Sequence, residues 1–250
     1  MLTSIRSLAA ATILAGCALA SAPAFAQEAT DPPADIVITG NVALTTDYRF
    51  RGVSLSGGDP AVQGGITATH SSGFYVGAWS SSISGGPVYG NQELDLFAGV
   101  GGKLAEGVNF DLGLLYYAYP SGHTGHADYF EPYASISTTV GPATAKFGVA
   151  YAWDQKSLGD DDNLYLFTNI DFAIPETPLT INTHLGYTDG VLGPDILAGG
   201  TDKSDFDWSI GATAKVFGPL SLSVAYIGAG GAKVDSLTDD TVVATLTASF

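Results

Sequence analysis

Charged residues and tyrosines recur at intervals of two in several parts of this sequence, and that spacing places them on one face of an extended strand. Asp47, Arg49 and Arg51 form the most compact of these sets. The remaining members are Glu93 and Asp95, Tyr117 and Tyr119, Glu131, and Asp207. Arginines that face carboxylates across a water-filled space create a transverse field, and such a field selects and orients polar or ionic solutes. We therefore interpret these residues as candidates for the lining and constriction of a pore.

The same charges have a structural interpretation, in which they form a salt-bridge network that fills or plugs the interior. Further residues on the same faces are Asp111, Asp171, Asp205, Lys146 and Lys215. Together the two groups hold eight acidic and four basic residues. If the interior conducts ions, this balance predicts a weak preference for cations.

The elements that must position these side chains are strands, because apolar and polar residues alternate with a period of two over most of the chain. The connections alternate between short turns and longer segments rich in Gly, Asp, Ser and Pro. This pattern is typical of an antiparallel meander that has short turns at one end and long loops at the other, as in outer-membrane barrels. No later segment shows a helical period, so we expect no helix after the N-terminal segment. We predict twelve strands, at residues 40–51, 60–70, 74–81, 91–101, 107–119, 127–138, 143–153, 162–173, 178–188, 205–217, 219–228 and 240–250.

The charges indicate which face of the predicted sheet is wet. No strand carries Asp, Glu, Lys or Arg on its apolar row. Twelve strands closed in a ring enclose more space than side chains readily fill, since about eight strands already give a filled interior. A Lys or Arg facing lipid near the midplane costs about 2–4 kcal/mol, so uncharged rows fit a lipid-facing belt. Aromatic residues near strand ends, among them Tyr48, Phe50, Phe206 and Trp208, would form the interfacial girdles of such a barrel.

The last strand ends on Phe250, and Val242, Leu246 and Ala248 share its parity. We expect this strand to pair with the first one and close the ring. A terminal strand with apolar alternation that ends in Phe resembles the signal read by the outer-membrane assembly machinery. Phe250 is therefore the candidate assembly signal.

Residues 1–26 are typical of a secretory signal peptide, with a positive start, a short apolar core and a cleavage site at Ala24-Phe25-Ala26. The alternative is lipidation at Cys17 in the stretch "LAGC". Residues 27–39 form a polar lead-in expected in the periplasm, and residues 40–250 form the barrel. Because Cys17 is the only cysteine, the mature domain is expected to have no disulfide and no metal bound through cysteine.

The formal net charge of −16 at pH 7 argues against nucleic acid as a partner. No dinucleotide, phosphate-loop or haem motif is present, so we expect no cofactor. His123 and His126 could bind a metal with Asp128, but a zinc site needs further convergent ligands, and plain polar loop residues are the better interpretation. A hydrolase would need a nucleophile, a base and an orienting group. His70 is the only histidine on an apolar row and has no evident partner, so we predict no catalytic residue and no enzyme.

Six stretches together form a more specific pattern. They are residues 41–81, beginning "NVALTTDYRFRGVS", then "ELDLFAGVG", "LGLLYYAYP", "DYFEPYASIS", "LTINTHLGYTDG" and "DFDWSIGATA". This set resembles the TorF porin family of proteobacteria over nearly all of the mature chain, and residues 46–54 are its most specific part. The resemblance implies a Gram-negative outer-membrane barrel and says little about the substrate. One departure is Pro132, where a proline removes a ladder donor, so we expect a bulge there.

The prediction is an all-β, transmembrane, antiparallel up-and-down barrel of about twelve strands in the outer membrane. Its predicted function is passive diffusion of small polar or ionic solutes. The alternatives are a closed structural or adhesive barrel that acts through its external loops and, less favoured, a barrel hydrolase. The loop at residues 189–204 could fold inward as a plug. The predicted partners are outer-membrane lipid, lipopolysaccharide, the assembly machinery and small solutes, and self-association is left open.

Overall fold

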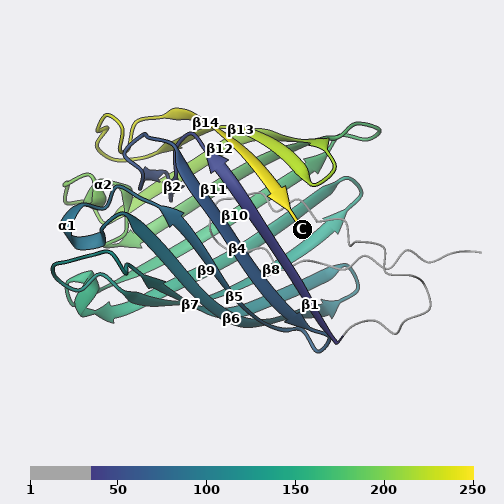
Figure 1. Ribbon diagram of the computed structural model, residues 1–250, viewed down its shortest axis with the longest axis horizontal. Helices are drawn as coiled ribbons and strands as arrows, with labels where there is room; N and C mark the ends of the chain where they lie inside the picture. The colour runs from purple at the N-terminus through teal and green to yellow at the C-terminus, as the bar shows by residue number, and fades with distance from the viewer. Residues whose placement is uncertain (1–34) are drawn as a thin grey trace, which may run out of the picture.

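The computed structural model describes residues 35–250, which form a closed antiparallel barrel (Figure 1). The predicted signal peptide, Cys17 and most of the predicted lead-in lie outside the described residues. Twelve strands make up the wall, and each pairs with the wall strands that precede and follow it along the chain. The last strand, β14, pairs with the first, β1, and closes the ring. The wall strands are β1 (Ile36–Thr45), β4 (Ala61–His70), β5 (Phe74–Ser82), β6 (Gln92–Ala105), β7 (Val108–Ala118), β8 (Tyr129–Val140), β9 (Ala143–Gln155), β10 (Asp161–Ala173), β11 (Leu179–Gly190), β12 (Ser204–Phe217), β13 (Leu220–Ala229) and β14 (Thr241–Ser249).

Closure of the ring confirms the expectation drawn from the last strand. Leu44 lies opposite Leu246 in the register of β1 and β14, and Asn41 lies opposite Ser249. Phe250 continues this pairing, because its backbone N–H and carbonyl exchange hydrogen bonds of 2.9 and 2.7 Å with Gly40. The barrel therefore has no free edge strand, which removes the unpaired backbone groups that edges expose.

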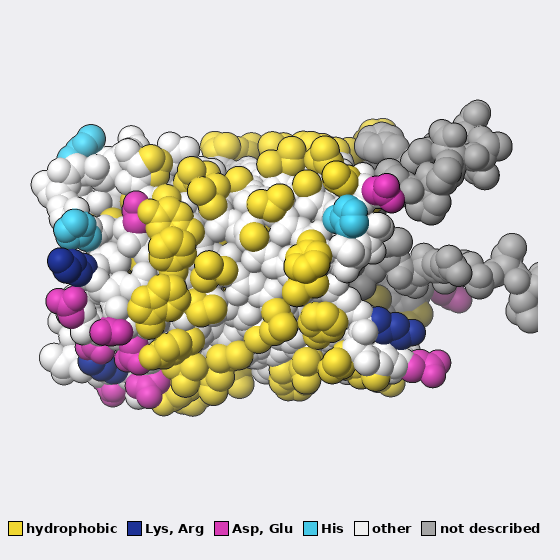
Figure 2. All heavy atoms as spheres, turned by 90° about the horizontal axis from the view of Figure 1, so that it is seen from below, with side chains coloured by type: hydrophobic (Ala, Val, Ile, Leu, Met, Phe, Trp, Pro, Cys, Tyr) yellow, Lys and Arg dark blue, Asp and Glu magenta, His cyan; other side chains and the backbone are white. Residues whose placement is uncertain are grey.

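The outer surface of the wall is apolar. Figure 2 shows hydrophobic side chains over the length of the barrel, with charged and histidine side chains gathered at its ends. These exposed side chains come from the apolar row of each of the twelve wall strands, as alternation requires. They include Val42, Leu44, Val62, Ile66, Val76, Leu96, Leu112, Leu114, Ile136, Phe147, Ile170, Leu185, Ile210, Val224, Val242 and Leu246.

The two ends of the barrel differ in the length of their connections. Tight turns join the strands at one end, which we call the turn end, and longer segments join them at the other, the loop end (Figure 1). The loop end carries α1 (Gly86–Tyr89), α2 (Pro194–Leu197) and a 3-10 turn at Lys156–Leu158, so the expectation of no helix is wrong for these single turns. None of the helices in residues 35–250 is long and apolar enough to cross a membrane.

The first strand departs from the prediction at both ends. It begins at Ile36 and ends at Thr45, whereas residues 40–51 were expected. Residues 47–57, which we call the inner hairpin, leave the wall and contain a separate two-stranded sheet of β2 (Arg49–Phe50) and β3 (Val53–Ser54). The pairing of β7 with β8 runs through Leu114 and Pro132 without a register shift, so the expected bulge is wrong on this side. On the other side, the pairing of β8 with β9 ends at Tyr133, next to Pro132.

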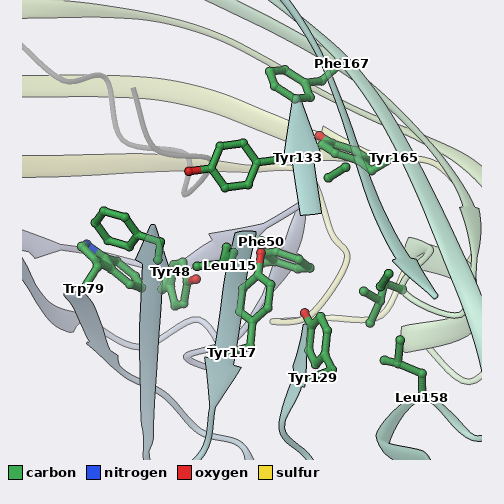
Figure 3. Close-up of a cluster of buried hydrophobic side chains, with 14 of the residues drawn as sticks. Tyr48, Phe50, Trp79, Leu115, Tyr117, Tyr129, Tyr133, Leu158, Tyr165 and Phe167 are labelled. Atoms are coloured by element: carbon green, nitrogen blue, oxygen red, sulfur yellow. The ribbon is translucent and has the colours of Figure 1, made fainter. Parts of the chain in front are cut away.

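The inner hairpin fills the loop end of the barrel interior. Tyr48 and Phe50 were expected on the outer girdle, but both are buried inside. The ring of Tyr48 lies 5.4 Å from that of Trp79 on β5, and the ring of Phe50 lies 5.9 Å from that of Tyr117 on β7 (Figure 3). The core of this protein is thus a cluster of inward-facing wall residues packed against a segment threaded inside the ring.

Candidate functional site: the lumen and its inner hairpin

The tip of the inner hairpin is a tight turn at Arg51 and Gly52. Both residues have positive φ, +49° at Arg51 and +80° at Gly52. A Cβ atom on Gly52 would lie 2.7 Å from the Cβ of Ala229 and 3.0 Å from the carbonyl oxygen of Gly228. Only glycine fits this close approach to β13 at that backbone angle. The stretch "RFRGVS" therefore folds into a turn inside the barrel, although its alternation resembles that of a wall strand.

Asp47 organises the hairpin from within. Its Oδ1 accepts hydrogen bonds from Ser54 Oγ at 2.5 Å and Ser56 Oγ at 2.9 Å, and its Oδ2 pairs with Arg49 Nε. Arg49 Nη1 also donates to the carbonyl oxygen of Asp239 at 2.9 Å, in the connection between β13 and β14. Asp47 and Arg49 are thus engaged in holding the hairpin together and fastening it to an outer loop.

Arg51 points across the interior to the opposite wall. Its Nη2 lies 2.7 Å from Oε1 of Glu131 on β8, and both side chains are almost fully buried. Its guanidinium carbon lies 4.1 Å from the ring centroid of Tyr165 on β10 and 4.7 Å from that of Phe50. A guanidinium over an aromatic face gains cation–π attraction that strengthens when water is excluded. The predicted meeting of an arginine with a carboxylate therefore exists as a closed ion pair.

Tyrosines connect the remaining carboxylates of the loop end. Glu93 on β6 accepts hydrogen bonds from the hydroxyls of Tyr48 at 2.6 Å and Tyr119 at 3.0 Å. Tyr117 donates to Oε2 of Glu131 at 3.3 Å. Asp95 is buried beside this group, and its Oδ1 has no hydrogen-bond partner among the described residues. These contacts bring four of the predicted residues of β6, β7 and β8, with Tyr119 just after β7, into one cluster.

Asp207 on β12 belongs to a second group that sequence reasoning did not assemble. Its Oδ1 lies 2.8 Å from Nε2 of His184, and the hydroxyl of Tyr165 lies 2.9 Å from the same nitrogen. The other ring nitrogen of His184, Nδ1, lies 2.6 Å from Oδ1 of Asn169. Because Tyr165 also contacts Arg51, it joins the two groups across the lumen. The parity shared with Asp171 was the signal that could have placed Tyr165 inside.

All nine predicted lining residues lie inside the ring or on the inner hairpin, eight of them buried and Tyr119 partly buried. A third polar group lies nearer the turn end, where the hydroxyl of Tyr75 donates to Asp111 at 2.6 Å and contacts the hydroxyl of Tyr133 at 2.5 Å. Lys215, in contrast, is exposed near the end of β12. The interior is therefore polar along its length and is blocked by packed side chains at the loop end.

The loop at residues 189–204 contributes to this closure in part. Leu192 is buried against the core cluster, and Val191 is packed against it. Asp195 holds the outer connections together by accepting hydrogen bonds of 2.9 Å from the backbone N–H groups of Thr201, Asp202 and Ala232. The principal plug is nevertheless the inner hairpin, of which the sequence interpretation had assigned the first part, up to residue 51, to the wall.

The histidine candidates lie at the ends of the barrel, with His123 and His126 in the connection between β7 and β8 and His70 as the last residue of β4. Within residues 35–250, no group of three or more His, Cys, Asp and Glu residues could hold a metal ion. Asp128 instead accepts hydrogen bonds from the hydroxyl of Tyr116 and the N–H of Tyr119. His70 has one side-chain partner, because Oγ of Ser72 lies 2.7 Å from its Nδ1. The backbone N–H of Ser72 donates to the same nitrogen, so this contact belongs to the turn after β4.

Comparison with known proteins identifies a family and a fold. The family model described as "Bacterial protein of unknown function (Gcw_chp)" matches residues 27–250. This chain belongs to the Gcw_chp family. No protein of curated function matches the sequence significantly. The TorF name is not among these matches, and that assignment stays a prediction.

Solved porin structures share the fold. The NanC porin matches with a TM-score of 0.58 at 10% identity, covering 86% of this chain and 99% of that one. The KdgM porin matches with a TM-score of 0.56 at 12% identity, covering 86% of this chain and 98% of that one. A second KdgM structure, in complex with disordered oligogalacturonate, has a TM-score of 0.55 at 11% identity and covers 86% of this chain and 98% of that chain. At such identities the likeness concerns the barrel alone.

Proposed function

We propose that this protein is an outer-membrane, porin-like channel for the passive diffusion of small polar or ionic solutes. The observation that carries the proposal is the inverted polarity of the barrel. Apolar side chains such as Leu44, Ile66 and Leu246 are exposed on the outside, while carboxylates and arginines are buried on the inside. A protein in water would hide the first set and expose the second.

A lipid environment accounts for this inversion. Lipid offers no hydrogen bonds to backbone groups, so only helices and closed barrels span it. A closed ring of twelve strands meets that requirement. The fold shared with the NanC and KdgM porins supports the same environment, and the KdgM complex with oligogalacturonate supports passage of a small polar solute. The proposed location implies export with removal of residues 1–26, contact with lipopolysaccharide, and insertion by the outer-membrane assembly machinery through Phe250.

The lining residues would give the channel a weak preference for cations. The carboxylates Glu93, Asp95, Glu131 and Asp207 are buried in the interior, and the guanidinium of Arg51 pairs with Glu131 among them. This excess of negative charge would favour cations over anions in transit. In the conformation described here the inner hairpin occupies the loop end of the interior, so conduction requires the hairpin to withdraw.

The filled loop end also favours one other candidate, a closed barrel that works through its outer loops. Single-channel conductance in a planar bilayer separates the two. The protein should be residues 27–250, refolded and shown to be folded by its heat-modifiable mobility on a gel. A matched pair of variants should replace residues 47–57, or as a control residues 121–127, with a short Gly-Ser linker.

We expect discrete current steps for the wild type, with a reversal potential under a KCl gradient that favours K⁺. The variant lacking the hairpin should conduct more often or in larger steps, because its lumen is emptied, and the control should resemble the wild type. Silence of all three folded proteins would refute the channel and favour the closed barrel. A preference for chloride would refute the assigned selectivity.

A further inference from the structure

The guanidinium of Arg51 lies in a pocket built by the opposite wall. Glu131 provides the charge at 2.7 Å, and the ring of Tyr165 provides a face at 4.1 Å. Tyr117 and Tyr129 stack on each other with ring centroids 4.5 Å apart, and both lie close enough to Arg51 to interact with its charge. A carboxylate beside flat aromatic faces is the combination that binds a planar organic cation, because the charge and the ring faces act on the same group.

Arg51 fills this pocket but leaves polar atoms in and around it without hydrogen-bond partners. Asp95 is 1% exposed, its Oδ1 has no hydrogen-bond partner among the described residues, and it lies close enough to Glu131 for the two charges to repel. Asp207, also buried, has an unpartnered Oδ2. On the other side of the contact, Nη1 of Arg51 has no acceptor within residues 35–250. A buried carboxylate and a buried N–H that both lack partners are costly, so the arginine is an incomplete fit.

The arginine can leave the pocket without breaking the wall. Thr45, the last residue of β1, and Ala61, the first residue of β4, are paired with each other. The pairing of β1 with β4 therefore closes beneath residues 47–57, and Thr46, the residue before them, is still bonded to Ala244 of β14 at 2.9 Å. The hairpin is held inside by two backbone hydrogen bonds, from the Ser54 N–H to Leu237 and from the Ser84 N–H to Leu55, and by side-chain contacts. Among the side-chain contacts, the Arg51–Glu131 pair reaches the far wall.

We propose that this pocket is the selectivity site of the lumen for solutes that carry a guanidinium or ammonium group. In the closed state, the side chain of Arg51 occupies the pocket in place of such a solute. This inference rests on the proposed channel function and adds a substrate class to it. A solute cation entering the pocket would replace the Arg51 guanidinium at Glu131 and could also satisfy Asp95. Occupation by solute and withdrawal of the hairpin would then favour each other, since a ligand shifts a two-state equilibrium by its differential affinity.

Binding and current should both be measured on residues 27–250, with ethylguanidinium as the probe and ethylurea as its neutral, nearly isosteric control. The variants are Arg51→Ala, which empties the pocket, and Arg51→Ala/Glu131→Gln, which also removes its charge. Lys215→Ala is the control variant, because it removes one positive charge from the exposed end of β12. Arg51→Gln serves as a second pocket variant if the alanine variant does not refold.

In detergent, calorimetry should show that Arg51→Ala binds ethylguanidinium and not ethylurea. Truncating one partner of a buried charge pair weakens binding by about 30-fold or more, so the double variant should lose this binding. The wild type and Lys215→Ala should bind more weakly than Arg51→Ala, because Arg51 occupies their pocket. In a bilayer, ethylguanidinium should reduce the K⁺ current of Arg51→Ala at concentrations that leave the double variant unaffected.

Equal binding of ethylguanidinium and ethylurea, or equal binding by the single and double variants, would overturn the inference. The detergent measurement decides this even if every bilayer is silent. Selective binding of ethylguanidinium together with silent bilayers would support the cation pocket and refute the channel function. Channel conductance without selective binding of ethylguanidinium would support the channel function and refute the cation pocket.

Discussion

The ion pair between Arg51 and Glu131 provides a direct test of whether the loop end of the lumen is dry. The side chains are 5% and 2% exposed, and their atoms approach to 2.7 Å. Replacing Glu131 with Gln keeps the shape and removes the negative charge, which leaves a guanidinium buried without its counter-ion. Breaking a buried pair in this way costs about 3–5 kcal/mol. We expect a value near the lower end, about 3 kcal/mol, because the cation–π contact with Tyr165 remains and repulsion between Glu131 and Asp95 is relieved.

The assay is equilibrium unfolding in urea of the barrel refolded into lipid vesicles, followed by tryptophan fluorescence. The matched control is Glu106→Gln, which makes the same chemical change in an exposed turn between β6 and β7. We expect the control to change the free energy of unfolding by no more than about 0.5 kcal/mol. Exposed ion pairs contribute at most about 1 kcal/mol, so a loss that small for Glu131→Gln would refute the description of this end as dry and closed. It would mean that water solvates the pair, as in an open constriction.

Three other predictions concern the wall, the C-terminus and the outer loops. Leu246→Arg should lower the free energy of unfolding in urea by about 2–4 kcal/mol for the barrel in vesicles, because this side chain faces lipid. The neighbouring Thr247→Arg should lower it much less, because Thr247 faces the interior. Equal losses would contradict the assigned faces. Phe250→Ala should lower the amount of heat-modifiable barrel in the outer membrane of cells while leaving refolding in detergent intact; normal amounts in cells would remove its role as assembly signal. The pKa of Asp195 is lowered by backbone hydrogen bonds, from the N–H of Asp202 first and then from Ala232 and Thr201. A lowered pKa means that the loop contact is stable above the ordinary carboxylate pKa of about 3.8 and is lost as the pH falls through the lower folded value. Protease cleavage of these loops should therefore increase only under acidic conditions, and Asp195→Asn should remove that pH dependence; an unchanged profile in the variant would refute the assignment.

The wall of this barrel was predictable because it depends on a local property. Successive side chains on a strand point to opposite faces, so alternation alone identified the twelve wall strands, their apolar row and the charge-bearing interior. The closing strand was equally clear, since Val242, Leu246 and Phe250 continue the pattern to the last residue. The same parity argument placed Glu93, Asp95, Glu131 and Asp207 inside.

Only the tertiary structure decided what fills the ring. Tyr48 and Phe50 alternate as wall residues do, and a hairpin inside the barrel has the same period of two as a strand in its wall, so periodicity cannot distinguish them. The turn at Arg51 and Gly52 is visible in the sequence as a single glycine, but its direction depends on the approach to Ala229 on β13, almost 180 residues later. Likewise, the meeting of Arg51 with Glu131 joins positions 80 residues apart. The strand register and the path of the hairpin set that contact, and the local alternation that identified the wall strands encodes neither.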